Sequence, residues 1–135
     1  MKQNTISIHT IGRGTYDLTQ ETNNLVEKSS MQTGLCHVFL THTSASLMLC
    51  ENYDPSVKDD LEKFLSRLVP DGDPMFTHRM EGEDDMPAHI RSILTHNDLT
   101  IPITNGQLKL GAWQGIYLYE HRTQTHQRKI IVSLF

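Results

Sequence analysis

The sequence predicts a single α+β domain over residues 1–135, with a mixed or largely antiparallel, sandwich-like β-sheet and about three helices. Strand and helix patterns are segregated along the chain: strand, helix, two strands, two helices, then a run of strands. Asn105-Gly106, between two of the late strands, is a strong hairpin signal. The length of 135 residues suits one core, whereas a (β/α)₈ barrel needs at least about 200 residues. A β-sandwich with helices over one face is the alternative.

The first part of the chain alternates between strand and helix patterns. Residues 5–9 alternate between apolar and polar side chains, as in a strand with one buried face, and residues 12–14 are typical of a turn. Residues 18–30 have helical spacing with a thin apolar stripe, and Gly34 ends that helix. A second strand, rich in β-forming residues, is expected over residues 35–41.

A polar tip follows this strand. His42-Thr43-Ser44-Ala45-Ser46 stands between two apolar strands and carries one imidazole and three hydroxyls. Such a set suits binding a phosphate or placing a proton, but Ser and Thr also favour ordinary hairpin loops. The segment does not match the Gly-x-Ser-x-Gly elbow, so a serine nucleophile is not expected. Both interpretations of the tip remain open.

The clearest helix signal lies at residues 54–68. Asp54 is a capping residue and Pro55 suits the first helical position. Apolar residues then recur at helical spacing and are expected to pack into the core: Val57, Leu61, Phe64, Leu65 and Leu68. A Pro- and Gly-containing loop from Val69 to Pro74 ends this helix.

The stretch from His78 to His89 contains two histidines around four carboxylates, with Gly82 between them to let the chain turn. Asp84 or Asp85 is expected to cap a second helix, in which Pro87 occupies the first turn. That helix is expected to pack through Ile90, Ile93 and Leu94. On it, Asp85 and His89 stand one turn apart on one face. Such a pair serves as an acid–base pair, as an oriented metal ligand or as a plain surface ion pair.

The remaining chain consists of strands. Leu99, Ile101 and Ile103 alternate with polar residues, and Pro102 indicates an edge position or a bulge because it cannot donate to a neighbouring strand. Residues 129–135 are apolar on both faces and are expected to form a central strand.

Glu120 stands out among these strands because it shares a face with Ile116 and Leu118. An unpaired carboxylate in that position would be costly, so it needs a partner. Arg122, Arg128 or a metal ion are the candidates.

Composition excludes several classes of protein. The net charge of −4 argues against a nucleic-acid binder. No apolar run approaches the ~18 residues of a membrane span, and the N-terminus lacks the apolar core of a signal peptide. A soluble, cytoplasmic protein is therefore expected, with no membrane partner. Cys36 and Cys50 fall on adjacent predicted strands and are expected to be free, buried thiols.

Several separated segments of the sequence together resemble one family. They are His42-Thr43-Ser44-Ala45-Ser46-Leu47, Glu51-Asn52-Tyr53-Asp54-Pro55, Glu81 to His89, Gly111-Ala112-Trp113-Gln114-Gly115-Ile116, and Glu120-His121-Arg122. This set resembles the YjbQ family, also called the secondary thiamine-phosphate synthase family, over nearly the whole chain. The resemblance implies an α+β fold unlike the barrel of the main thiamine-phosphate synthase, and a homotrimer. It also implies a weak thiamine-phosphate synthase activity, which joins a pyrimidine pyrophosphate to a thiazole phosphate.

The resemblance and the residue chemistry together select the candidate site residues. The candidates for catalysis are His42, Asp85, His89 and Glu120. Those for substrate binding are Thr43, Ser44, Arg122 and Arg128. Those for metal binding are His42, His78, Asp85 and His89. We expect His42, Asp85 and His89 to converge on one pocket.

The cofactor and the function each leave two alternatives. Asp84 and Asp85 offer the oxygens that Mg²⁺ prefers, whereas imidazoles with one carboxylate suit Zn²⁺ or another transition metal. The first functional interpretation is an enzyme acting on a small phosphorylated metabolite. The second is a non-catalytic trimer that binds a metal ion or such a metabolite.

Overall fold

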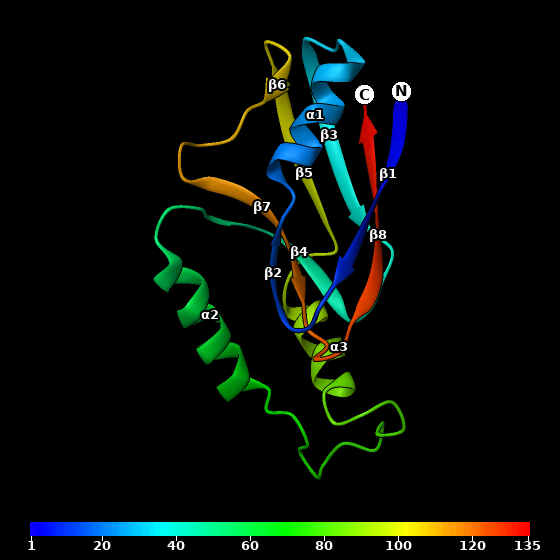
Figure 1. Cartoon of the computed structure of the whole chain (residues 1–135), viewed down its shortest axis with the longest axis vertical. Helices are drawn as coiled ribbons and strands as arrows, with labels where there is room; N and C mark the ends of the chain where they lie inside the picture. The colour runs from blue at the N-terminus through cyan, green and yellow to red at the C-terminus, as the bar shows by residue number, and fades with distance from the viewer.

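Two antiparallel sheets and three helices make up the protein, which a computed structural model describes over residues 1–135 (Figure 1). The elements in chain order are β1 (Lys2–Thr10), β2 (Gly14–Asp17), α1 (Thr19–Ser29), β3 (Thr33–Leu40), β4 (Ala45–Glu51), α2 (Pro55–Leu68), α3 (Asp85–Leu94), β5 (Asp98–Thr104), β6 (Gln107–Leu108), β7 (Gln114–Glu120) and β8 (His126–Leu134). None of the helices combines the length and the apolar character needed to cross a bilayer.

The larger sheet has the strand order β1-β8-β3-β5-β6, and the smaller has the order β2-β7-β4. Every pairing in both sheets is antiparallel. β8 pairs with β1 on one side and with β3 on the other, so the last strand is central, as predicted. The predicted α+β class is confirmed.

The main hydrophobic core lies between the sheets, and a smaller cluster of Met48, Leu65, Tyr117 and Tyr119 joins α2 to the smaller sheet. The main core contains Val38, Ile101 and Ile130 of the larger sheet together with Leu47 and Leu118 of the smaller one. Because strands from both ends of the sequence share this core, the chain folds as one sandwich-like domain. Helix α1 adds Val26, which is fully buried.

Local turn and strand signals predicted the β5–β6 hairpin correctly. Residues of β5 alternate strictly between exposed and buried. Asn105 and Gly106 both have positive φ, 52° and 76°, as a two-residue primed turn requires. β6 pairs with Ile103 and Thr104, and the Lys109 N–H that follows it donates to the Pro102 carbonyl at 2.8 Å. The outer edge of β5 before Pro102 has no neighbouring strand.

Two expectations about strands are wrong. Strand β2 was missed, because four residues without an apolar alternation carry little periodic signal. The tip after β3 is not a hairpin: β3 belongs to the larger sheet and β4 to the smaller one. Cys36 and Cys50 therefore lie in different sheets rather than on paired strands. Both are free thiols, and burial raises the pKa of Cys36 to about 11.

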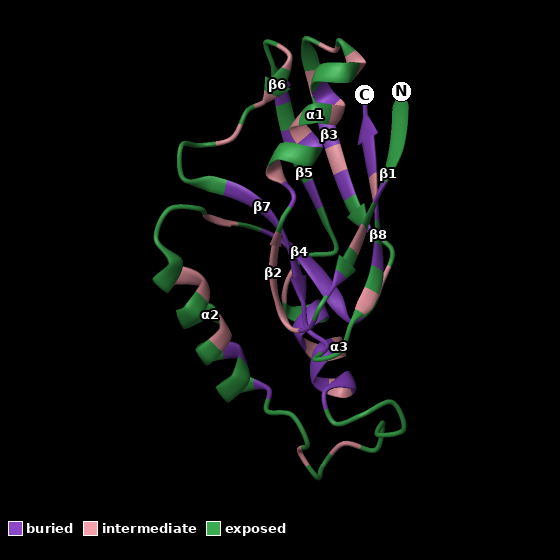
Figure 2. Cartoon of the chain, in the orientation of Figure 1, coloured by how far each residue is buried: buried purple, intermediate pink, exposed green.

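Helix α2 begins as predicted but does not pack as predicted. The Asp54 side chain accepts a hydrogen bond from the Ser56 N–H at 2.9 Å, and Pro55 opens the helix. Of its apolar residues only Leu65 is buried, while Phe64 and Leu68 are each 54% exposed. Most of α2 is coloured as exposed in Figure 2. The pattern correctly predicts an amphipathic helix, but the core of this chain is already filled by the sheets. Placing this apolar stripe in the core was therefore an error.

Helix α3 buries a different face from the one predicted. Ile93 and Leu94 are 80% and 57% exposed, whereas Ala88 and Ser92 are buried. Small and hydrogen-bonding side chains let the helix approach β4 closely, and the Ser92 hydroxyl donates to the Ala45 carbonyl at 3.1 Å. Neither predicted cap forms, because Asp84 makes no side-chain cap and instead accepts from residues that follow β7.

Candidate metal centre

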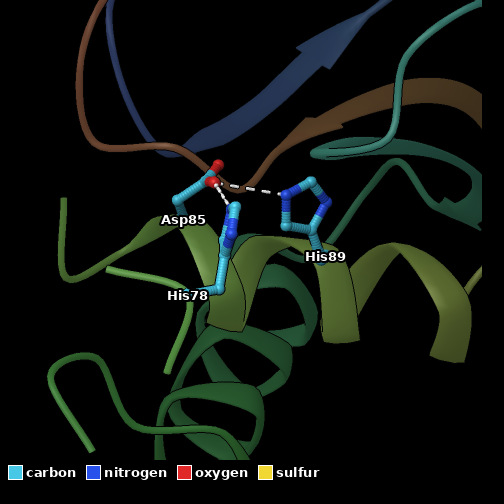
Figure 3. A group of neighbouring side chains, drawn as sticks. All are labelled: His78, Asp85 and His89. Carbon is cyan, nitrogen blue, oxygen red and sulfur yellow. Dashed lines mark hydrogen bonds and ion pairs between the residues drawn. The ribbon is translucent and has the colours of Figure 1, made fainter. Parts of the chain in front are cut away.

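Three side chains converge where α3 begins. The Nε2 atoms of His78 and His89 lie 2.7 and 3.2 Å from one oxygen of Asp85, Oδ2 (Figure 3). One potential ligand atom from each residue lies within 4.8 Å of the other two. The Asp85 carboxylate is buried, while both rings are partly open to solvent. Three of the four predicted metal ligands are therefore held together by the fold.

Local sequence explains how they meet. Asp85 and His89 are four residues apart on α3 and so lie on one face, as predicted. His78 arrives from the long loop of residues 69–84 that joins α2 to α3. Gly82, with φ of 114°, lets this loop turn back, and a Cβ there would meet the Asp84 carboxylate at 2.9 Å.

Arg122 binds the other side of the same carboxylate. Its Nη1 lies 2.9 Å from Asp85 Oδ1, and its Nε donates to Asp84 Oδ2, also at 2.9 Å. Burial alone would raise the pKa of the Asp85 carboxyl, but the hydrogen bond from His78 and the charge of Arg122 outweigh it and hold that pKa below its ordinary value. Asp85 is therefore a carboxylate, the form that binds cations.

The hydrogen bonds of His89 place its proton. Nδ1 lies 3.0 Å from the carbonyl oxygen of Thr43, which can only accept, so Nδ1 carries the hydrogen. In a neutral ring Nε2 then has a lone pair, yet it faces Asp85 Oδ2, which is also an acceptor. The ring must either take a second proton or share a cation with the carboxylate. An Nδ1–H bonded to a backbone carbonyl is the usual arrangement of a metal-binding histidine.

Two imidazole nitrogens and one carboxylate oxygen form a ligand set for zinc or another transition metal rather than for Mg²⁺. Three protein ligands also leave coordination positions open for water or substrate. A cavity of about 220 Å³ adjoins the centre and is lined by Thr43, His89, Ser92, Ile93 and Asn97. A smaller one of about 80 Å³ lies on the His78 side.

His42 lies outside this cluster. Its Nε2 accepts a hydrogen bond from the backbone N–H of Lys129 at 2.9 Å, which satisfies a polar group of β8. Partial burial and the nearby charge of Arg128 lower the pKa of the His42 ring. The residue of this tip that contacts the metal centre is Thr43, whose backbone carbonyl oxygen bonds to His89 Nδ1. A catalytic or ligand role for His42 stays a prediction.

Glu120, Arg128 and Ser44 form a separate buried network. Arg128 Nε donates to Glu120 Oε1 at 2.8 Å, and its Nη2 donates to the Ser44 hydroxyl at 3.0 Å. The Thr10 hydroxyl also donates to Glu120, at 2.6 Å. Arg128 is thus the partner that the Glu120 carboxylate was predicted to need. Both arginine candidates, Arg122 and Arg128, are buried and paired with carboxylates. Binding of a substrate phosphate by either one stays a prediction.

The comparison with known families decides the relationship of this chain. The family model described as "UPF0047 protein YjbQ-like" matches residues 4–135. The chain belongs to the YjbQ family. The resemblance seen in the sequence motifs is thereby confirmed over nearly the full length.

Relatives support this assignment at the level of whole chains. A UPF0047 protein of Synechocystis sp. is 48% identical over 132 residues, which cover 98% of this chain and 90% of the relative. The UPF0047 protein YjbQ of Escherichia coli O157:H7 is 43% identical over 98% of this chain and 96% of its own length. The names of these relatives state no reaction.

Solved crystal structures share the fold. A YjbQ/UPF0047-family protein from Clostridium acetobutylicum superposes with a TM-score of 0.89 at 32% identity, and the match covers 98% of this chain and 99% of that one. A conserved protein from Thermus thermophilus gives a TM-score of 0.85 at 32% identity, with coverage of 98% and 99%.

Two further polar residues of this YjbQ-family chain are fully buried: His121, which belongs to one of the sequence motifs, and Arg91, which no sequence pattern singled out. His121 is fully buried and lies 2.8 Å from the Ser46 hydroxyl through Nε2, while its Nδ1 has no partner. Arg91 of α3 is also fully buried and binds Glu62 of α2 with both terminal nitrogens.

Proposed function

We propose that this chain is a metal-dependent enzyme that acts on a small phosphorylated metabolite, with His78, Asp85 and His89 as the metal ligands. One observation carries the proposal: His89 Nε2 and Asp85 Oδ2 face each other at 3.2 Å while His89 Nδ1 is already committed to the Thr43 carbonyl. A divalent cation between the two acceptors resolves that conflict. The nitrogen-rich ligand set favours Zn²⁺.

The reaction to test first is the one that the family resemblance implies. Thiamine-phosphate synthesis joins a pyrimidine pyrophosphate to a thiazole phosphate and releases pyrophosphate, whose negative charge a metal ion neutralises. The 220 Å³ cavity beside His89, which Thr43 and Asn97 also line, suits a small polar substrate. A cytoplasmic location, expected from the sequence, belongs to the same proposal.

Zinc titration tests the metal centre. The metal-free protein is expected to bind one Zn²⁺ per chain. Asp85→Asn and His89→Ala are each expected to weaken binding at least about tenfold, because the first neutralises one of three ligands and the second removes one. His37→Ala is the matched control, since His37 also pairs with an aspartate, Asp98, at 2.8 Å but lies outside the cluster of the centre. Calorimetry and elemental analysis give affinity and stoichiometry. Equal affinity in wild type and His89→Ala would refute this centre.

Activity separates the enzyme from a binding protein. The enzyme is supported if His89→Ala has no synthase turnover, and if the wild type loses turnover on chelation and regains it when Zn²⁺ is added back. The alternative is a non-catalytic binder of a metal ion or phosphorylated metabolite. The burial of Arg122 and Arg128 favours it, because a metal ion would then be the main positive charge that a pyrophosphate could meet. Tight metal binding with turnover unaffected by these changes would support the binder.

We also propose that the chain assembles as a homotrimer, as the family resemblance implies. The exposed apolar side chains of α2 (Leu61, Phe64 and Leu68) and the outer edge of β5 before Pro102 offer surface that a neighbouring copy would cover. Light scattering at micromolar concentration is expected to give about three times the chain mass of 15.4 kDa. The mass of a single chain would contradict the proposal.

A further inference from the structure

The guanidinium group of Arg122 binds three residues of the stretch 81–85, where the loop of residues 69–84 runs into α3. Nε donates to Asp84 Oδ2 at 2.9 Å, Nη1 pairs with Asp85 Oδ1 at 2.9 Å, and Nη2 donates to the carbonyl oxygen of Glu81 at 2.7 Å. The residue follows β7 and is only 7% exposed. Two of these contacts hold the start of α3, and the third holds the loop that carries His78.

We propose that Arg122 is the positioning residue of the metal centre, which orients the Asp85 carboxylate and fixes the loop that delivers His78. This inference rests on the proposed metal-binding function and goes beyond it, because Arg122 touches no metal. The sequence suggested that this residue binds a substrate phosphate, whereas its contacts point to a role in building the centre.

The first part of this role concerns Asp85. Both imidazoles face Oδ2, and Arg122 occupies Oδ1. A free carboxylate rotates and can bind a metal ion through both oxygens. With Oδ1 held by the guanidinium, Asp85 offers a single oxygen, so more coordination positions stay open for water and substrate.

The second part concerns the loop of residues 69–84. Several hydrogen bonds of this loop are internal, such as those from Arg79 to the carbonyls of Phe76 and Pro74. Between residues 74 and 82, the side-chain hydrogen bonds that leave the loop are the one from His78 to Asp85 and the one from Arg122 to Glu81. Apart from the contact of His78 with Asp85, the hydrogen bond from Arg122 to Glu81 is therefore the side-chain contact that anchors this part of the loop to the rest of the protein.

Lysine cannot replace arginine in this position. The planar guanidinium directs its N–H groups along fixed directions, whereas an ammonium is a single point charge on a flexible stem. A lysine would keep the positive charge beside Asp84 and Asp85 but would not also hold the Glu81 carbonyl. Arg122→Lys therefore tests the hydrogen-bond geometry of the guanidinium while the positive charge is kept.

The test compares Arg122→Lys with Arg13→Lys. Arg13 binds Asp71 of the same loop with both terminal nitrogens at 2.9 and 3.0 Å but does not contact Asp85, so it is a matched control. In Arg122→Lys, zinc affinity measured by competition with a chromophoric chelator is expected to fall about 10–100-fold, as for other residues that orient ligands. The visible spectrum of bound Co²⁺ is expected to change as well. Arg13→Lys should stay within about twofold of wild type, because it removes no contact of the centre.

The outcomes separate this inference from the metal centre itself. If the wild type binds no Zn²⁺, the proposed function fails. If the wild type binds Zn²⁺ and Arg122→Lys binds it equally well with the same Co²⁺ spectrum, the centre stands and the role of Arg122 is wrong. Should Arg122→Lys not fold by circular dichroism, Asp84→Asn takes its place, because it weakens the hold on Arg122 without changing a ligand. Unchanged zinc affinity in that variant overturns the inference.

Discussion

Replacing Glu120 with alanine is expected to lower the free energy of unfolding by about 3–5 kcal/mol, because it leaves the buried Arg128 guanidinium without its counter-charge. Glu120 is fully buried and Arg128 is 3% exposed. Burial would raise the pKa of the Glu120 carboxyl, but hydrogen bonds from Arg128 and Thr10 outweigh burial and hold it below its ordinary value. The pair is therefore charged in the folded protein. Urea denaturation monitored by circular dichroism measures the loss.

A double variant isolates the cause. Glu120→Leu combined with Arg128→Met removes both charges and fills a similar volume, so it is expected to recover much of the stability that Glu120→Ala loses. A loss below about 1 kcal/mol in the single variant, close to the range of ordinary surface changes, would show that Arg128 finds another partner. Because Glu120 was selected as a catalytic candidate, the activity of its variants must be compared per folded molecule.

The sequence predicted the elements whose signals are local. The Asp54-Pro55 start of α2, the alternation of β5 and the Asn105-Gly106 turn all depend on neighbouring residues. The partners against which an element packs are far away in the sequence, and the wrong predictions concern such partners. The α2 stripe was assigned to the core although only Leu65 is buried. The strands on either side of the His42 tip were expected to be adjacent, although β3 and β4 lie in different sheets.

The same distinction explains the candidate site. Asp85 and His89 were predicted on one face because four residues separate them on a helix, and His78 precedes that helix by a short stretch. The contact of Arg122 with Asp85 depends on how the smaller sheet brings the end of β7 to α3, which no sequence pattern reports. His42 stands at the same tip as Thr43, but only the Thr43 carbonyl points to His89.

Acid is expected to destabilise the fold through His121. The ring is fully buried with Nδ1 unpartnered. Burial, together with the positive charges of Arg91 and Arg13, which outweigh the nearby carboxylates, lowers its pKa to about 3. In the unfolded chain an imidazole takes up its proton near pH 6.5, on the order of the ordinary histidine pKa. Between these two pH values the unfolded state binds more protons, so stability is complete above about pH 6.5 and falls by about 1.4 kcal/mol per pH unit below it.

From about pH 6.5 to about pH 5 the loss through His121 amounts to about 2 kcal/mol. Urea unfolding at fixed pH values, with a chelator present so that metal release does not contribute, measures it. His121→Gln is expected to flatten the pH dependence by that amount even where it lowers stability at neutral pH, because the titrating ring is gone. His96→Gln, the same change at an exposed position, is the control. If His121→Gln and the wild type lose stability equally over this range, His121 is already protonated in the folded protein, and the buried ring has a counter-charge or a water that satisfies Nδ1.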